Sequence, residues 1–169
     1  AGISIQNALE LSKRNFKLAI ANPALMALIY LSILPVIHGI TNLDATHTAE
    51  ILEKFVSPIG IIFFVPICRP EMDICIRETV YIKPYSFVKI VGIRMSMATT
   101  VMGIIIIAFS GILYIADCDF PFFQYVAGSI ITALVLGCVG IMTTVLSNNI
   151  IAGYLVSLGF LLLNWNGVI

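Results

Sequence analysis

A short charged stretch, residues 71 to 83, holds the side chains of this chain that are best suited to bind another protein. The candidates are Glu71, Asp73, Arg77, Glu78 and Lys83. On a helical wheel over residues 71 to 81, the first four share one face and mainly apolar residues share the other. Asp73 and Arg77 are four apart, in the acid-then-base order that supports a helix. The pattern predicts a short amphipathic helix that could dock on a soluble protein. The alternative is a solvated loop whose basic residues only fix the topology of its neighbours.

The rest of the chain offers little for catalysis or cofactor binding. It contains no G-x-x-x-x-G-K-[ST] motif and so does not hold a nucleotide by the P-loop route. Its four cysteines lack the C-x2-C spacing of zinc sites, and we interpret them as apolar fillers. His38 stands alone near the end of an apolar run and is better explained as an interfacial polar residue than as a ligand. We therefore expect no catalytic, cofactor-binding or metal-binding residue here.

Composition indicates the class of protein. Hydrophobic residues make up 60% of the 169 positions and charged residues only 11%, whereas about 25% of a typical soluble domain is charged. A helix that crosses a membrane needs about 20 apolar residues, so the length suits five crossings and their loops. We predict an all-α fold, a polytopic membrane helix bundle that forms a single transmembrane domain over residues 1 to 169.

The predicted elements follow from the positions of the apolar runs. The five spans are expected at residues 24–40, 49–68, 95–116, 122–146 and 150–166. An amphipathic helix over about 3–20 precedes them and is expected to lie in the membrane interface, and residues 69–94 form a segment between the second and third spans. Glu53 and Lys54 are expected near the outer boundary, where a charge costs less than at the centre of a helix.

Basic residues divide unevenly between the two sides of this topology. One side has Lys54 alone, and the other has Lys13, Arg14, Lys17, Arg69, Arg77, Lys83, Lys89 and Arg94. Short loops that are rich in Lys and Arg stay in the cytoplasm. We therefore expect the N-terminus and residues 69–94 inside the cell. The outer face then carries Asp44, Glu50, Glu53, Asp117 and Asp119.

The fourth predicted span has a line of small residues. Ser129, Ala133 and Gly137 recur every four residues and therefore share one face of a helix. Small side chains on one face let a neighbouring backbone approach closely. We predict that these three residues form a helix-packing seam and not a chemical site.

The segment from residue 66 onward resembles the junction between the second and third spans of ABC-2 type permeases, the membrane subunits of a class of bacterial ABC exporters. The matching features are Pro70-Glu71, the helix over 71–81, the run Lys83-Pro84-Tyr85-Ser86, and Arg94 at the start of the third span. The amphipathic start resembles the connecting helix of that family, and "NNIIAGYLVSLGFLLLN" is similar to the fifth span of Gram-positive members.

The resemblance covers most of the chain but not its end. In the family, an outer re-entrant hairpin and a sixth span should follow the fifth. The sequence also starts without methionine, so both ends look trimmed, and the absence of a sixth span leaves open whether the chain is whole.

The resemblance implies a transmembrane subunit of an ATP-driven exporter in the bacterial cytoplasmic membrane. Two copies, or one copy with a related chain, would line a path between them. A separate ATP-binding cassette subunit would dock on the 71–81 helix through the five charged residues at 71, 73, 77, 78 and 83, and would bind ATP and Mg²⁺. This chain would itself be no enzyme, and its other partners would be membrane lipids and not nucleic acid.

Three other functions compete with this interpretation. An ion-coupled carrier usually buries Asp, Glu, Lys or Arg in its spans, and four of the five predicted spans have none. An intramembrane enzyme would need a constellation of acidic residues or histidines, which His38 alone does not supply. A non-transporting membrane scaffold or immunity protein would bind partners through the same amphipathic helix. The substrate is not indicated, since apolar span surfaces suit lipid, peptide and drug alike.

Overall fold

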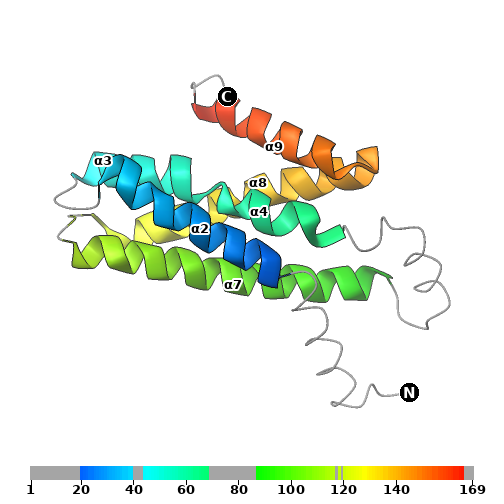
Figure 1. Cartoon of the computed structure of the whole chain (residues 1–169), viewed down its shortest axis with the longest axis horizontal. Coiled ribbons are helices and arrows are strands. Elements are labelled where there is room, and N and C mark those ends of the chain that lie inside the picture. Colours follow the sequence, from blue (N-terminus) through cyan, green and yellow to red (C-terminus); the bar gives the residue numbers. More distant parts are fainter. Residues whose placement is uncertain (1–19, 40–43, 69–86, 117, 119, 166–169) are drawn as a thin grey trace, which may run out of the picture.

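The computed structural model describes residues 20–39, 44–68, 87–116, 118 and 120–165, and within these residues the chain is helical and contains no strand. The elements are α2 (Ala21–His38), α3 (Ala45–Glu50), the π-helical turn η1 (Ile51–Val56), α4 (Ile59–Phe64), the 3-10 turn η2 (Val65–Cys68), α7 (Phe87–Ile115), α8 (Phe122–Ser147) and α9 (Ile150–Trp165) (Figure 1). The prediction of an all-α fold is confirmed for this part of the chain. The predicted helices over 3–20 and 71–81 lie outside it, except for Ile20.

Helix α8 is the centre of the bundle. It packs against α9, α4 and α7 and also contacts η1 and η2. Helix α2 packs on α4, α7 and η1 (Figure 1). The fully buried side chains between these helices are large and apolar, and they include Phe63, Phe64, Met102, Ile106 and Leu136. Apolar contact between helices therefore holds the described residues together.

Polar side chains within the long helices are satisfied by their own backbone. The hydroxyls of Thr99, Ser129, Thr143 and Thr144 each donate to the carbonyl four residues earlier, at 2.8 to 2.9 Å. This internal bonding lets a serine or threonine sit in an apolar helix without an outside partner. Among the residues that the structure describes, only the hydroxyls of Ser110 and Ser157 are buried without a hydrogen bond.

The segment expected as one span over residues 49–68 is helical but not uniform. It begins earlier, at Ala45, and changes to π geometry in η1, where the Ser57 N–H donates to the carbonyl of Leu52, five residues back, at 3.2 Å. The Ser57 hydroxyl donates to the Glu53 carbonyl, which a regular helix would give to the Ser57 N–H. Pro58 follows and has no N–H to continue the ladder. The proline therefore explains why the helix is interrupted at this point.

A tight turn joins α8 to α9. Asn148 adopts a left-handed conformation, with φ of 50°, and ends α8, while the Asn149 N–H donates to the Thr144 carbonyl at 3.3 Å. The Asn149 side-chain oxygen then accepts from the Ile151 N–H at 2.9 Å and caps α9. The two asparagines, residues 148 and 149, thus form the whole connection between α8 and α9.

Among the described residues, two helices are long and apolar enough to cross a membrane. They are Val91–Ile115 within α7 and Phe122–Ser147. The apolar helices Ala21–Ile37 and Ile150–Trp165 are shorter than that limit. Helix α7 starts at Phe87, so residues 87–94, expected as part of the segment between spans, continue the third span as one unbroken helix.

Candidate functional site

The two elements that flank the charged segment, η2 and α7, are in contact with each other. The guanidinium of Arg94 is the polar link at this junction: its Nη1 donates to the Ile67 carbonyl at 3.3 Å, and the residue is only 6% exposed. The elements before and after the charged segment are therefore linked directly, about two turns into α7.

Arg94 is suited to this position by its chemistry. The last carbonyls of a helix have no partner within the helix, and Ile67 lies in the 3-10 turn that ends the 45–68 segment. A guanidinium always carries charge and offers five donors. It can therefore satisfy a helix-end carbonyl of one element while its own backbone belongs to another. We name the contact between Arg94 and Ile67 the inner junction, after the side of the membrane on which the sequence predicts it.

The predicted partner-binding residues themselves lie outside the described part of the chain. They are Glu71, Asp73, Arg77, Glu78 and Lys83. Their arrangement on the face of a helix stays a prediction. The structure instead describes the elements that flank them, η2 and α7, and the contacts of η2 with α8 and α9.

The three small residues of the predicted packing seam are all buried on α8. Two of them lie against α4: a Cβ added to Gly60 would overlap the backbone of Ala133, and a Cβ added to Gly137 would lie 2.8 Å from the Phe64 ring. Ser129 is fully buried and bonds to its own helix. The backbones of α4 and α8 thus approach each other closely at Gly60.

A second close crossing, between α8 and α9, was missed from the sequence. A Cβ at Gly153 would overlap the Thr144 hydroxyl and lie 2.9 Å from the Gly140 carbonyl, and a Cβ at Gly140 would lie 2.7 Å from the Ser157 hydroxyl. Gly140 with Thr144, and Gly153 with Ser157, are each four apart. That spacing of small residues on two consecutive helices was the available signal.

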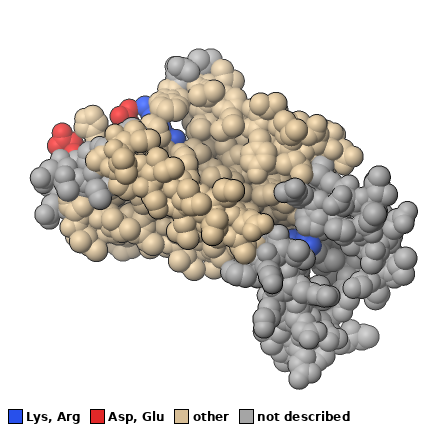
Figure 2. All heavy atoms as spheres, in the orientation of Figure 1, with Lys and Arg blue, Asp and Glu red and all other residues tan. Residues whose placement is uncertain are grey.

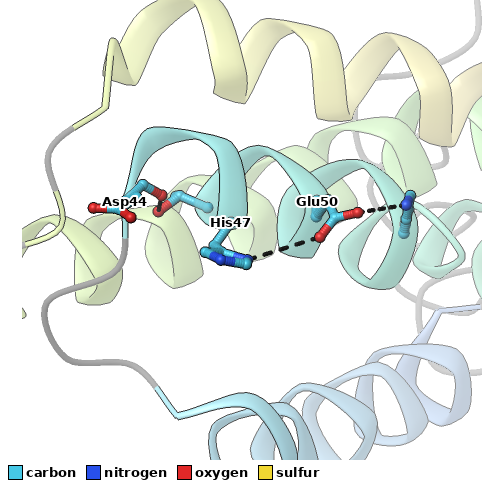
Figure 3. A network of polar contacts seen from close by, with 5 residues as sticks. Asp44, His47 and Glu50 are labelled. Carbon is cyan, nitrogen blue, oxygen red and sulfur yellow. Dashed lines mark hydrogen bonds and ion pairs between the residues drawn. The ribbon is translucent and has the colours of Figure 1, made fainter.

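The other described charges gather at the opposite end of the molecule, around α3 and η1 (Figure 2). The Lys54 ammonium lies 2.6 Å from a Glu50 carboxylate oxygen, and the His47 ring lies 3.9 Å from the other oxygen (Figure 3). Lys54 also lies 5.8 Å from the centre of the Trp165 ring, which meets Phe55 edge to face at 5.3 Å. We name Glu50, Lys54, Phe55 and Trp165 the outer clasp, because they join η1 to the end of α9 and because the sequence predicts this end on the outer side.

The charged groups in and beside the outer clasp are partly or largely exposed to solvent. His47 and Glu50 have exposed side chains, 68% and 54% accessible, and water screens an ion pair at such a site. No group of three or more His, Cys, Asp or Glu residues comes together among the described residues. The clasp is therefore best understood as a contact that holds the end of α9.

Replacing Trp165 tests the clasp. We expect Trp165→Ala to lower the free energy of unfolding by about 1 to 2 kcal/mol, because the edge-to-face ring pair and the cation contact are lost together. Leu155→Ala is the matched control on α9, since Leu155 is 66% exposed and should matter little. Chemical unfolding followed by circular dichroism compares the two variants. Equal stability would show that the clasp contributes nothing.

Comparisons with known proteins do not assign this chain to a family. No protein-family model, no curated protein and no solved structure matches the chain. The inner junction, the two close helix crossings and the outer clasp are therefore the observations from which a function must be argued.

Proposed function

We propose that this chain is the membrane subunit of an ATP-driven ABC exporter, with residues 69–86 as the docking segment for a separate ATPase. The inner junction is the observation that carries this proposal. A segment that transmits force from a motor needs both ends fixed to the elements that it moves. Here η2 ends one helical segment, α7 begins another, and Arg94 links them through the Ile67 carbonyl. A push on the segment would therefore reach both helices at once.

A membrane location is supported by the distribution of charge and burial. Between the charges of η1 and Arg94, the described helical surface carries no Asp, Glu, Lys or Arg. Large apolar side chains are exposed over that surface, among them Ile33, Ile104, Ile131 and Leu155. The most apolar stretch of each long helix is only 33% buried within the molecule, whereas a core helix of a soluble protein is mostly covered. Lipid is the solvent that such a surface fits.

Orientation follows in this proposal from the basic residues. The inner junction faces the cytoplasm of a bacterial cell together with the N-terminus, because eight of the nine Lys and Arg residues belong to that side of the predicted topology. The outer clasp then faces outward. Two copies, or this chain and a related one, line the path, and ATP and Mg²⁺ are bound by the partner.

Charge reversal in the docking segment tests the proposal. A P-loop ATPase encoded by the neighbouring reading frame is the expected partner, and it should co-purify with the full chain. Arg77→Glu combined with Glu78→Lys should weaken that binding at least about tenfold, because complementary charges become like charges at the contact. The measurement is the fraction of ATPase retained on the tagged chain.

The control reverses a charge pair at the opposite end. Glu50→Lys combined with Lys54→Glu keeps the ion pair of the outer clasp and should leave ATPase binding unchanged. An ATPase that still binds after the change at positions 77 and 78 would count against the docking assignment. Hydrolysis of ATP by the complex, stimulated by a transported substrate, would separate an exporter from a non-transporting scaffold.

A further inference from the structure

An aromatic cluster covers the turn between α7 and α8. Its members are Tyr114, Phe120, Phe122, Phe123 and Tyr125. The rings form a connected group: Phe120 stacks on Tyr125 at 5.8 Å, Tyr114 meets Phe122 at 5.9 Å, and Phe122 meets Phe123 at 5.8 Å. Two of the rings remain open to the surroundings, since Phe123 is 86% and Tyr114 is 62% exposed. We name these five residues the turn cluster.

The exposed rings belong to a continuous apolar surface. Ile115, beside the turn, is 82% exposed, and Ile104 and Ile112 are exposed further down α7. In water such a surface would be costly, because each large apolar side chain buried contributes about 1.5 to 3 kcal/mol. Within the turn cluster, both tyrosines add a hydroxyl to an apolar ring. Rings of this kind prefer the boundary between hydrocarbon and headgroups over either side of it.

The spacing along α7 fits the thickness of a bilayer. Arg94 and Tyr114 are separated by about 20 residues of one continuous helix, or ~30 Å. The hydrocarbon core of a bilayer is about 30 Å thick. No Asp, Glu, Lys or Arg occurs on α7 between the two residues. If Arg94 marks one boundary, Tyr114 reaches the other.

We propose that the turn cluster binds lipid at the boundary between headgroups and acyl chains, in the leaflet farther from Arg94, and so fixes the depth of the bundle. This inference rests on the membrane location within the proposed function. The partner is the bilayer itself, recognised by the exposed rings of Tyr114 and Phe123.

The outer clasp lies deeper than the turn cluster in this arrangement. Lys54 precedes Ile67, the residue at the inner junction, by about 13 residues, or ~20 Å of helix. Its ammonium reaches back to Glu50, one turn farther from the inner junction, as a long basic side chain does when it extends toward an interface. Trp165, which contacts Lys54 and Phe55, is therefore deeper than Phe123.

The experiment measures depth by fluorescence quenching. Trp165 is the only tryptophan of the chain, so a Trp165→Phe background carrying Phe123→Trp reports on the turn cluster alone. The full chain is reconstituted in phosphatidylcholine vesicles with bromine atoms either near the headgroups or near the bilayer centre. We expect the shallow bromines to quench position 123 roughly twice as strongly as the deep bromines. A ring at the headgroup boundary is close to the shallow bromines, whereas the deep bromines are farther away by a large part of the thickness of one leaflet.

A matched control comes from the middle of α7. Ile104 is 61% exposed and lies halfway between Arg94 and Tyr114, so Ile104→Trp in the same background should be quenched more by the deep bromines. Two results would overturn the inference. One is strong quenching of position 123 by the deep bromines. The other is quenching of position 123 by aqueous iodide while neither brominated lipid has an effect. If the native Trp165 and position 104 are quenched by lipid and position 123 is not, only the turn cluster assignment fails. If lipid quenches none of these positions, the membrane location fails with it.

Discussion

Gly60→Ala is expected to disrupt the bundle more than any other single methyl group added to the described residues. The new Cβ would overlap the Ala133 carbonyl oxygen and lie 2.6 Å from its carbonyl carbon and 2.9 Å from its Cα. These are backbone atoms of α8, which cannot move aside as a flexible side chain can. Overpacking of this kind costs about 1 to 3 kcal/mol and occasionally more, and we expect the upper part of that range. Thermal unfolding in detergent, followed by circular dichroism, measures the loss.

Gly128→Ala supplies the matched control for this prediction. Gly128 lies on α8, and an added Cβ meets no heavy atom within 4 Å. Replacing a helical glycine with alanine favours the helix by up to about 1 kcal/mol when nothing clashes. The two variants add the same atoms and should therefore shift stability in opposite directions. Equal effects would show that α4 and α8 do not approach each other as described.

Arg94→Met is expected to give the second large effect. The change removes the charged donor of the Ile67 carbonyl, and a hydrogen bond to a charged group contributes about 1.5 to 3 kcal/mol. Methionine fills a similar volume but leaves that carbonyl without this bond. The loss should be concentrated at the inner junction, so the amides in the first turns of α7 should exchange hydrogen faster. Hydrogen exchange read by mass spectrometry measures this change.

Arg94→Lys distinguishes the charge from the geometry. Lysine keeps the positive charge on a compact ammonium and loses the planar fork of the guanidinium. We expect partial recovery of protection in α7 relative to Arg94→Met. In the proposed exporter, both variants should bind the ATPase, while transport falls in proportion to the loss of protection. Wild-type exchange rates in Arg94→Met would contradict the role of the inner junction.

Much of the fold was predictable because apolar runs of helical length dominate the sequence. The helix α8 was expected over residues 122–146 and ends one residue later, because Asn148 favours the left-handed conformation that stops a helix. The start of the 45–68 segment was less predictable. Its polar first turns, with Thr46, Thr48 and Glu50, do not look apolar, and they are helical because the helix continues outward past the hydrophobic run.

The contacts were harder to predict than the elements. The four-residue spacing at Ser129, Ala133 and Gly137 indicated a packing face but not its neighbour, since helical periodicity does not say which helix will cross it. Arg94 was expected on the cytoplasmic side as a topology signal, and its burial against Ile67 depends on a contact 27 residues away in the chain. Sequence spacing shows only local relations, so such long-range pairs emerge only from the folded chain.

The π-helical turn η1 contains one residue more than a turn of α-helix. The residues on either side of this wider turn therefore keep the relative directions that they would have in a regular helix one residue shorter. Deleting one residue from Ile51–Val56 would close the wide turn into ordinary helix. Glu50, which precedes η1, would then keep its direction relative to α4, whereas a deletion in regular helix would turn it by about 100°.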